Sequence, residues 1–260
     1  MLDKITPLIL TYNEENNIKR TLSQLVWAQR IVVIDSYSTD QTLNILSCYP
    51  QVQIFQRRFD THANQWNYGL DCVSSLWVLS LDADYFVSQE LISEITRISE
   101  NYTINGYFIK FKYCVFGKPL RGTILPPRQA LFRKDKSMYV DDGHTQLLQV
   151  EGNSGTLNNY IYHDDRKPFS RWLQAQDKYM SIEAEKLLTT SCSELNLADK
   201  IRKKKILAPF IILIYCLILK RGILDGWHGW YYALERTLAE IILSVRLIER
   251  EYQILQKNLD

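Results

Sequence analysis

The chain has 260 residues, of which 46% are hydrophobic and 23% charged, and this composition excludes a disordered chain and predicts a large apolar core. Lys and Arg number 31 against 29 for Asp and Glu, so the net charge of +2 gives no reason to expect a nucleic-acid partner. The five cysteines are scattered without a CxxC pair, which argues against a disulfide framework or a zinc site. The first sixteen residues do not have the pattern of a signal peptide, so we expect a cytoplasmic protein.

Short apolar runs alternate with amphipathic segments through the first third of the chain. The runs typical of strands are residues 5–11, 30–35, 52–55 and 76–82. The segments typical of helices are residues 15–28, 39–48 and 62–73. This alternation predicts βαβ units, and therefore an α/β fold in which helices cover both faces of a parallel sheet.

Polar residues follow three of these four strands. They are the turn from Thr11 to Glu14, Asp35 with its neighbour Ser36, and the pair Asp82 and Asp84. Ligands of open parallel sheets bind at the carboxyl ends of the strands. We therefore expect the three polar groups to meet in one crevice.

The pair Asp82 and Asp84 stands at positions i and i+2 where a strand ends. Both side chains can then point to the same side and bind one hard divalent cation, Mn²⁺ or Mg²⁺, which could hold a diphosphate. The alternative interpretation is a solvated strand end or a cap for the helix that begins near Ser88.

The middle of the chain changes character. Residues 106–117 form a partly alternating run, residues 118–128 are rich in proline, and an apolar run follows. This pattern predicts additional strands and a long loop that could hold a second substrate. Residues 170–190 return to helical spacing.

Four segments in the first ninety residues resemble a known family. ILTYNEENNI, VVIDSYSTDQT, ANQWNYGLD and WVLSLDADY follow the order and spacing of the inverting glycosyltransferases of family 2. The resemblance implies a GT-A, Rossmann-like nucleotide-sugar domain over residues 1–168. A helical, membrane-associating C-terminal extension would occupy residues 169–260.

Later segments are similar to a subgroup, the bacterial lipopolysaccharide-core and related cell-surface glucosyltransferases. They are PPRQALFRKD, MYVDDGHTQLL, YHDDRKPFSRWLQAQDKYM and LDGWHGWYYALER. The resemblance implies transfer of a sugar from a nucleotide-diphosphate sugar to a glycan or lipid-linked acceptor in cell-envelope polysaccharide or lipopolysaccharide synthesis.

The resemblance also assigns roles to single residues. Those that would contact the nucleoside are Thr11, Tyr12, Asn13, Glu14 and Asp35. Asp82 would contact the ribose or the metal, and Asp84 would bind the metal that bridges the diphosphate. Two positions depart from the family pattern, because Tyr37 stands where glycine is common and Tyr85 where a third acidic residue often stands.

An inverting transfer needs a carboxylate that takes the proton of the acceptor hydroxyl. We expect Asp142 to be this base, with Asp141 as the second choice. Members of the subgroup often have His-Glu where this chain has His144 followed by Thr145, so the acid must come from elsewhere. The alternative interpretation of Asp142 and Gly143 is a polar hairpin turn.

Positive charge must stabilise the leaving diphosphate. In the segment HDDRK, His163 could complete the metal shell and Arg166 could face the phosphates. Arg128 and Arg133 are expected to contact the phosphates or the acceptor, and otherwise would be ordinary surface charges.

The C-terminal region is basic and contains a long apolar run. Residues 200–260 hold 11 Lys or Arg against 6 acids, and residues 206–219 are apolar between two groups of cations. A helix of that length spans about 21 Å, short of the ~30 Å hydrocarbon core. We expect it to lie in the interface of an anionic membrane, at the cytoplasmic face of the inner membrane. The alternatives are a buried core helix or the interface of a homo-oligomer.

Two other functions remain open at this point. Phosphatases of the haloacid-dehalogenase type also use a DxD pair, but they normally place it on their first strand, whereas here it follows the fourth. A non-catalytic membrane-bound scaffold on the same fold is the third interpretation.

Overall fold

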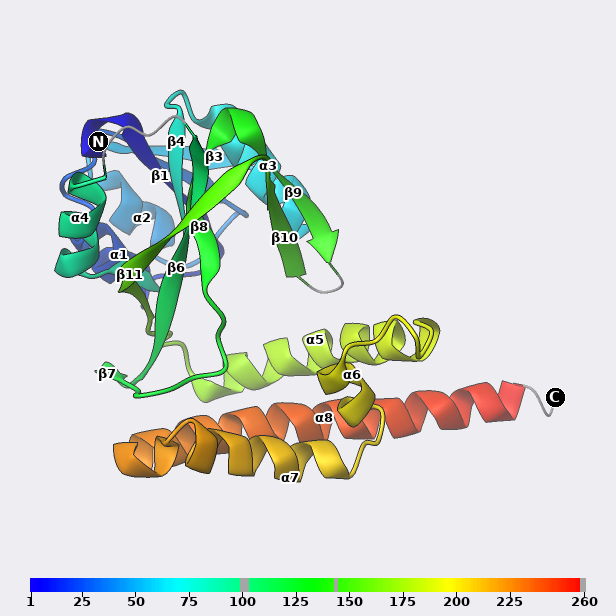
Figure 1. The fold of residues 1–260 in the computed structure, drawn as a ribbon. Helices are drawn as coiled ribbons and strands as arrows, with labels where there is room; N and C mark the ends of the chain where they lie inside the picture. The colour runs from blue at the N-terminus through cyan, green and yellow to red at the C-terminus, as the bar shows by residue number, and fades with distance from the viewer. Residues whose placement is uncertain (99–102, 143–144, 258–260) are drawn as a thin grey trace. The chain divides into compact units, whose positions relative to one another are not determined.

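The computed structural model describes residues 1–98, 103–142 and 145–257. The chain divides into two compact units (Figure 1). The first comprises residues 1–119 and 125–166, and the second comprises residues 120–124 and 167–260. The division at Arg166 lies two residues before the expected boundary at 168, and the short segment 120–124 joins the helical unit.

A mixed sheet forms the centre of the first unit, with the strand order β3-β2-β1-β4-β8-β6-β11-β5. Its strands are β1 (Ile5–Thr11), β2 (Ile31–Asp35), β3 (Val52–Gln56), β4 (Trp77–Asp82), β5 (Tyr85–Val87), β6 (Ile104–Val115), β8 (Arg128–Arg133) and β11 (Asn153–His163). The strands β1 to β4 are parallel, whereas β8 runs antiparallel between β4 and β6. The short β7 (Lys118–Pro119) pairs with the end of β6.

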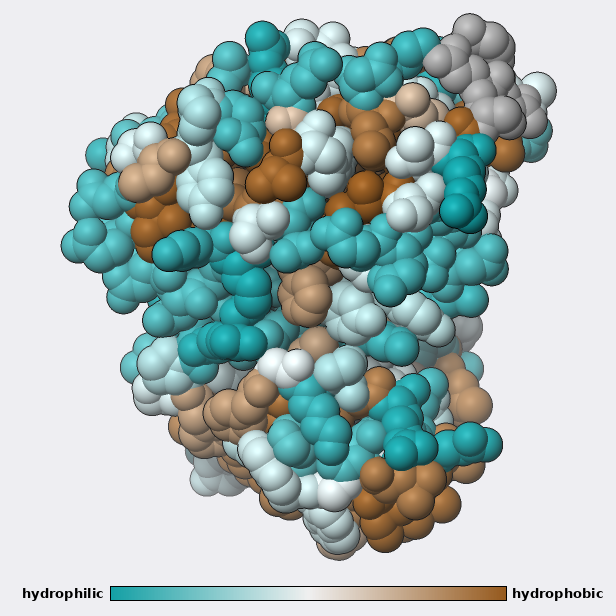
Figure 2. Space-filling model, turned by 90° about the vertical axis from the view of Figure 1, so that its left-hand side faces the viewer, coloured by the Kyte–Doolittle hydropathy of each residue, from teal (hydrophilic) through white to brown (hydrophobic). Residues whose placement is uncertain are grey.

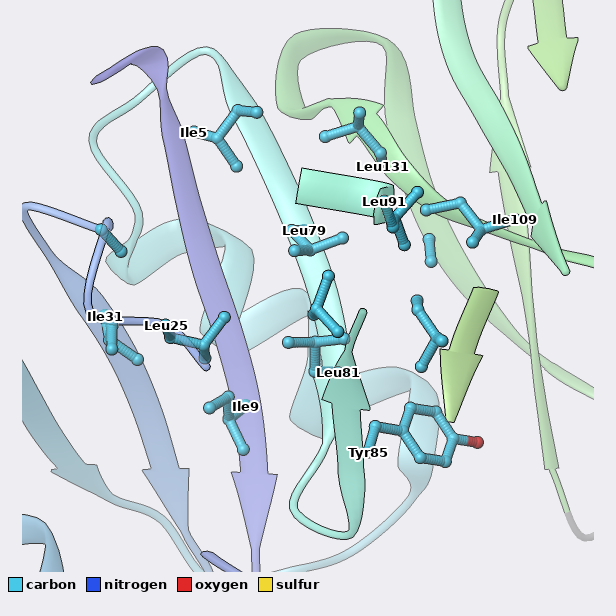
Figure 3. Packing of buried hydrophobic residues seen from close by; sticks show 14 of the residues in the cluster. Ile5, Ile9, Leu25, Ile31, Leu79, Leu81, Tyr85, Leu91, Ile109 and Leu131 are labelled. Atoms are coloured by element: carbon cyan, nitrogen blue, oxygen red, sulfur yellow. The ribbon is translucent and has the colours of Figure 1, made fainter. Parts of the chain in front are cut away.

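Helices cover both faces of this sheet, as the sequence predicts (Figure 1). One face carries α1 (Ile18–Ser23), α2 (Thr42–Ser47) and α4 (Gln89–Thr96), and the other carries α3 (His62–Cys72) with the hairpin of β9 (Ser137–Asp142) and β10 (Thr145–Val150). Alternation along β1 explains the two layers, because Ile5 and Ile9 pack on the first face (Figure 3) and Leu8 on the second.

The helix α1 is shorter than its amphipathic segment. Expected over residues 15–28, it spans Ile18–Ser23, because the residues before it form a turn in which the amides of Asn17 and Ile18 donate to the carbonyl of Glu14. The caps of α3 and α4 follow the usual chemistry: the hydroxyl of Thr61 accepts from the Asn64 amide, and that of Ser88 from the Leu91 amide.

The second unit is helical. It contains α5 (Phe169–Thr189), α6 (Leu197–Arg202), α7 (Leu207–Ile214), the π-helical turn η3 (Tyr215–Leu219), the 3-10 turn η4 (Gly222–Asp225) and α8 (Trp227–Lys257). Buried leucines of α5 and α8, Leu187, Leu243 and Leu247 among them, form its apolar cluster. Pro209 lies in the first turn of α7, where its missing N–H costs no helical hydrogen bond.

Two glycines allow η4 to approach the start of α8. A Cβ atom on Gly229 would lie 1.9 Å from the carbonyl oxygen of Gly222, so no larger residue fits at position 229 without moving the backbone. This contact gives a physical reason for Gly229, the second glycine of the segment LDGWHGW.

The apolar run of residues 206–219 is not a buried core helix within this unit. It buries Ala208, Pro209, Cys216 and Leu217, and the large side chains on its other side are exposed. Among the described residues, no helix is both long and apolar enough to cross a membrane.

Candidate active site

Strand pairing brings the three polar groups to one edge of the first unit. In the parallel register, Thr11 pairs with Asp35 on one side of β1, and Leu10 pairs with Asp82 on the other side. The carboxyl ends of β1, β2 and β4 therefore lie next to one another, which is the arrangement that the strand order predicts. Any ligand bound at this edge would meet all three groups.

Asp35 is fully buried and joins the ends of three strands. Its carboxylate accepts hydrogen bonds from Thr11 Oγ1 at 3.1 Å, from the Ser38 amide at 2.9 Å and from Gln56 Nε2 at 3.3 Å. Both carboxylate oxygens thus hold the loops that form the edge. In this structure Asp35 positions the first turn and the second loop relative to each other.

Two residues in the adjoining loops adopt the left-handed backbone conformation. Asn13 has φ 56° and Tyr37 has φ 62°. Glycine adopts such values without a steric cost, whereas a tyrosine at this position has to bear one. The Asn13 side chain compensates by accepting from the Thr39 amide at 2.7 Å, while the Asn13 amide donates to Ser38 Oγ at 2.8 Å.

The other two residues of the first turn differ in exposure. Tyr12 is 53% exposed, so its ring lies open to solvent. Glu14 is buried: its amide donates to Thr42 Oγ1 at 2.7 Å, and its carboxylate accepts from Asn17 Nδ2 at 3.0 Å. These two hydrogen bonds fix Glu14 in the interior and stabilise the turn.

Asp84 and His163 come together from distant parts of the chain. The short β5 runs antiparallel to β11 and pairs Tyr85 with His163, which brings His163 Nε2 to 3.0 Å from Asp84 Oδ2. The rings of Tyr85 and Tyr113 flank the imidazole edge-on. Burial by itself would lower the pKa of His163, but the carboxylates of Asp84 and Asp82 outweigh it and raise that pKa above its ordinary value.

Tyr85, which contacts His163, is also affected by the charges of Asp82 and Arg128. Burial and the charge of the Asp82 carboxylate raise the pKa of Tyr85 well above its ordinary value. Arg128, at the start of β8, acts on the same tyrosine with the opposite sign. Arg128 is exposed, and the antiparallel register of β8 with β4 directs this end of β8 toward the carboxyl end of β4, where Asp82 lies.

Arg133 is not brought to this edge, unlike the other expected site residues on these strands. The strand β8 runs antiparallel to β4, so Arg133 pairs with Trp77 at the amino end of β4. Its guanidinium binds Asp135 at 2.8 Å. A strand moves the chain by about 3.3 Å per residue, and five residues therefore place Arg133 at the far end from Arg128.

The donor atoms at this edge suit a divalent cation of the Mn²⁺ or Mg²⁺ type. Two ligands of one ion, each bound at about 2.1 Å and at right angles, lie about 3 Å apart. Asp84 Oδ2 and His163 Nε2 are 3.0 Å apart and joined by a hydrogen bond, which a cation bound to both would replace, and Asp82 stands two positions before Asp84 in the sequence. The described residues do not contain a group of three or more His, Cys, Asp or Glu already arranged around one point.

A buried polar network lies behind this edge and was not singled out from the sequence. Its centre is Asn17, which is fully buried. Asn17 Nδ2 donates to Asp165 Oδ1 at 2.9 Å, and Asn17 Oδ1 accepts from the Arg166 amide at 3.0 Å. Because Asn17 also holds Glu14, it connects the first turn to the segment that follows His163.

Asp164 is the charged part of the same network, with 1% of its side chain exposed. Its carboxylate lies 2.9 Å from Arg166 Nη2 and 3.6 Å from Arg20 Nη1, and it accepts from the Gly117 amide at 3.1 Å. Its own amide donates to the carbonyl of Asp84 at 3.1 Å. Two cations are therefore fixed close to the aspartate pair, one of them on the half-exposed Arg166 side chain.

The two residues expected to supply the base end the strand β9. Asp141 accepts from the Ala63 amide at 3.3 Å, at the amino end of α3. The side chain of Asp142 lies outside the described part of the structure, as does His144. The backbone of β9 runs toward the same edge as the carboxyl ends of the parallel strands (Figure 1).

Similarity to known proteins agrees with this geometry. The chain is 29% identical over 268 residues to an uncharacterized glycosyltransferase of Rickettsia prowazekii (strain Madrid E), covering 95% of this chain and 87% of that protein. It is 20% identical over 270 residues to the lipopolysaccharide core biosynthesis glycosyltransferase LpsC of Rhizobium meliloti (strain 1021), covering 98% and 96%. With the SPbeta prophage-derived glycosyltransferase SunS of Bacillus subtilis (strain 168), it shares 33% identity over 110 residues, and it spans only 25% of that protein.

A solved structure shows the same fold. The crystal structure of S. aureus TarS 1-349 in complex with UDP-GlcNAc matches with a TM-score of 0.52 at 18% identity, covering 96% of this chain and 91% of the other. The first unit therefore has a mixed α/β fold of the GT-A type, and the chain ends in helices. The family model "Glycosyl transferase family 2" matches residues 8–153, more than half of the chain. The chain belongs to glycosyl transferase family 2.

Proposed function

We propose that the protein transfers a sugar from a nucleotide-diphosphate sugar to a glycan or lipid-linked acceptor, with inversion at the anomeric carbon. One observation carries the proposal: Asp84 and His163 lie 3.0 Å apart at the sheet edge where Asp82 and the first turn also end. This arrangement supports the metal and diphosphate site of a glycosyltransferase.

The donor would occupy the carboxyl edge of β1, β2 and β4. We assign the nucleoside to the turn that contains Tyr12 and Asn13, and Asp35 keeps this turn in place through Thr11 and Ser38. The exposed ring of Tyr12 offers an aromatic surface to a base. The fully buried carboxylate of Asp35 suits a positioning role.

The diphosphate would lie against the cations and the aspartate pair. Asp84, His163 and Asp82 would hold a divalent cation, which when bound neutralises charge on the diphosphate. Arg166 is half-exposed beside them and is oriented by Asp164, so its guanidinium can stabilise the leaving group. Arg128 lies toward the same end of β4 as Asp82 and suits the acceptor or the phosphates.

The reaction needs one proton acceptor. A carboxylate takes the proton of the acceptor hydroxyl. The oxygen of that hydroxyl bonds to the anomeric carbon, while the bond from this carbon to the diphosphate oxygen breaks. We assign this role to Asp142 and keep Asp141 as second choice, because Asp141 is engaged at the amino end of α3. The similarity to LpsC along nearly the whole chain supports an acceptor in lipopolysaccharide or another cell-envelope glycan.

The two other interpretations of the sequence fare differently. A haloacid-dehalogenase-like phosphatase is not supported, because the chain belongs to family 2 and its aspartate pair follows β4. A non-catalytic scaffold would keep the fold but would not need the contact between Asp84 and His163.

A donor panel tests the proposal. The protein is incubated with UDP-, GDP-, dTDP- and CMP-linked sugars, with Mn²⁺, with Mg²⁺ or with a chelator, and release of the nucleotide is measured. We expect release from one class of nucleotide-diphosphate sugar, stimulated by a divalent ion and lost in Asp84→Asn. If the protein releases no more nucleotide than a protein-free control with every donor, the result would favour the non-catalytic scaffold.

A further inference from the structure

We propose that the helical unit binds the surface of an anionic lipid bilayer through one face, formed by α7, η3, η4 and the first two turns of α8. In a cell this surface would be the cytoplasmic leaflet of the plasma membrane. The inference concerns this unit alone and does not depend on the transferase chemistry. We call this surface the apolar face.

The apolar face consists of large side chains that the unit leaves exposed. They are Leu207, Phe210, Ile211, Ile214, Ile218, Leu219, Ile223, Leu224, Trp227, Trp230 and Leu234, each between 44% and 69% exposed. The spacing from Leu207 through Phe210, Ile211 and Ile214 to Ile218 follows the helical repeat, so these side chains lie along one side of the helix. Figure 2 shows hydrophobic side chains clustered on the helical unit.

On an ordinary soluble surface, exposed hydrophobic side chains are scattered singly, whereas on the apolar face many of them lie together. The other side of the same helix packs against α8 and contains Ala208, Cys216 and Leu217. A helix that is apolar on both sides needs an apolar environment on its outer side as well. Trp227 and Trp230 add aromatic rings of the kind that prefer the headgroup level of a bilayer.

The charges around this face have one sign. Lys204 precedes the apolar run of residues 206–219 and Arg221 follows it, and both are exposed. Lys220 is half-buried, with its Nζ atom 5.3 Å from the centre of the Tyr215 ring. Between residues 200 and 235 the sequence has two acids, and both are buried: Asp225 is 4% exposed and bound by Arg121 at 3.2 Å, and Glu235 is 7% exposed. Such a rim attracts an anionic surface.

Charge of one sign disfavours the second occupant, another copy of this chain. In a two-fold dimer the same face meets itself, so the cations of both copies would come together without acidic partners. The face therefore fits an anionic bilayer better than a homo-oligomer.

The structure changes which cations we expect to matter. Arg202 lies 2.8 Å from Glu240 and 3.7 Å from Glu183, and Lys205 forms an ion pair with Glu251. These two cations, which the basic segment IRKKK suggested as lipid contacts, are neutralised within the unit. The attraction to lipid thus rests on the remaining cations beside the apolar run, Lys203, Lys204, Lys220 and Arg221, of which Lys204 and Arg221 are exposed.

Vesicle flotation tests the charged rim. The full chain is mixed with phosphatidylcholine vesicles that contain or lack phosphatidylglycerol, and the floated fraction gives the partition coefficient. We expect Lys204→Gln/Lys220→Gln/Arg221→Gln to weaken binding to the anionic vesicles by about 10²-fold, the loss expected for three cations near such a surface. The matched control Arg58→Gln/Arg97→Gln/Lys136→Gln makes the same change in net charge within the first unit and should bind like the wild type.

A second pair of variants tests the apolar part. Phe210→Ser/Ile214→Ser should lose binding to the anionic vesicles, whereas Ile248→Ser/Tyr252→Ser, which changes equally exposed side chains farther along α8, should not. Brominated lipid should quench the tryptophan emission of the wild-type protein, a measurement that needs no variant to fold. The variant Trp227→Phe/Trp230→Phe should show less quenching.

Three results would overturn the proposal. One is a wild-type protein that stays unbound with both vesicles, and another is binding that the rim variant retains in full. The third is a dimer in vesicle-free solution that Phe210→Ser/Ile214→Ser dissociates, because the second copy would then be the occupant of this face.

Discussion

Asp84 and His163 stand 79 positions apart in the sequence, yet their side chains lie within 3.0 Å of each other at the end of the sheet. The contact depends on β5, which leaves the aspartate pair and returns antiparallel along the last residues of β11. A single turn after β4 thus fixes the distance between a carboxylate and an imidazole.

The buried Asp164 should be essential for the stability of the first unit. Asp164→Asn leaves Arg20 and Arg166 without their shared counter-charge, and breaking a buried ion pair from one side costs about 3 kcal/mol of unfolding free energy. Urea unfolding measures the loss. Asp71→Asn, an exposed change in α3, is the control and should unfold like the wild type; a common midpoint for both variants would show that the network contributes little.

The two aspartates that end β9 should separate by function. Asp142→Asn should keep the affinity for the donor and lower turnover by about 10²-fold, the usual loss for a positioned base. Asp141→Asn should keep turnover within a few-fold and weaken the start of α3 by about 0.5 kcal/mol. Single-turnover rates and donor titration check both statements. Loss of turnover in Asp141→Asn alone would move the base to Asp141, and normal turnover in both would place it outside this segment.

Glu94 should make the first unit sensitive to acid. Burial alone would raise the pKa of Glu94, but hydrogen bonds from the amides of Asn158 and Asn159, at 2.8 and 2.9 Å, hold it below its ordinary 4.5. A lowered pKa in the folded state gives stability that is present above pH 4.5 and lost as the pH falls through the folded value.

The variant Glu94→Gln isolates this contribution. It should unfold about 1 kcal/mol more easily than the wild type at neutral pH. The difference should shrink as the pH falls below 4.5, which a series of urea titrations would show. A difference that is constant with pH would mean that the charge of Glu94 plays no part.

The parallel half of the sheet could be predicted because its signals are local. Apolar runs such as residues 31–35 are buried on both faces, so sequence continuity identifies them as strands. The mixed half could not be predicted in the same way. The insertion of β8 between β4 and β6 depends on pairing over long distances, and nothing in residues 128–133 specifies its direction.

The candidate site shows the same division between local and distant information. The turn after β1 and the aspartate pair follow from motifs that are continuous in sequence. Arg133 was expected to contact the phosphates or the acceptor, like Arg128, and the antiparallel register places it at the opposite edge of the sheet. Asn17 has the sequence context of a surface helix, and its burial results from Asp165, which is 148 positions away.

Binding of a nucleoside diphosphate with and without metal tests the central claim most directly. Calorimetry would compare UDP, GDP and dTDP, in Mn²⁺ and in a chelator, for the wild type, Asp84→Asn and the control Asp71→Asn. The claim is that Asp84 helps to hold a divalent cation against the diphosphate. Because one carboxylate ligand is lost, the variant should not respond to the metal.

The predicted result is that the wild type and Asp71→Asn bind one of these nucleotides at least about 10²-fold more tightly with Mn²⁺ than in the chelator. Asp84→Asn should bind weakly and equally in both. Tight binding that is the same in all three proteins and unaffected by metal would contradict the account, because the contact between Asp84 and His163 would then be only a structural feature of a strand end.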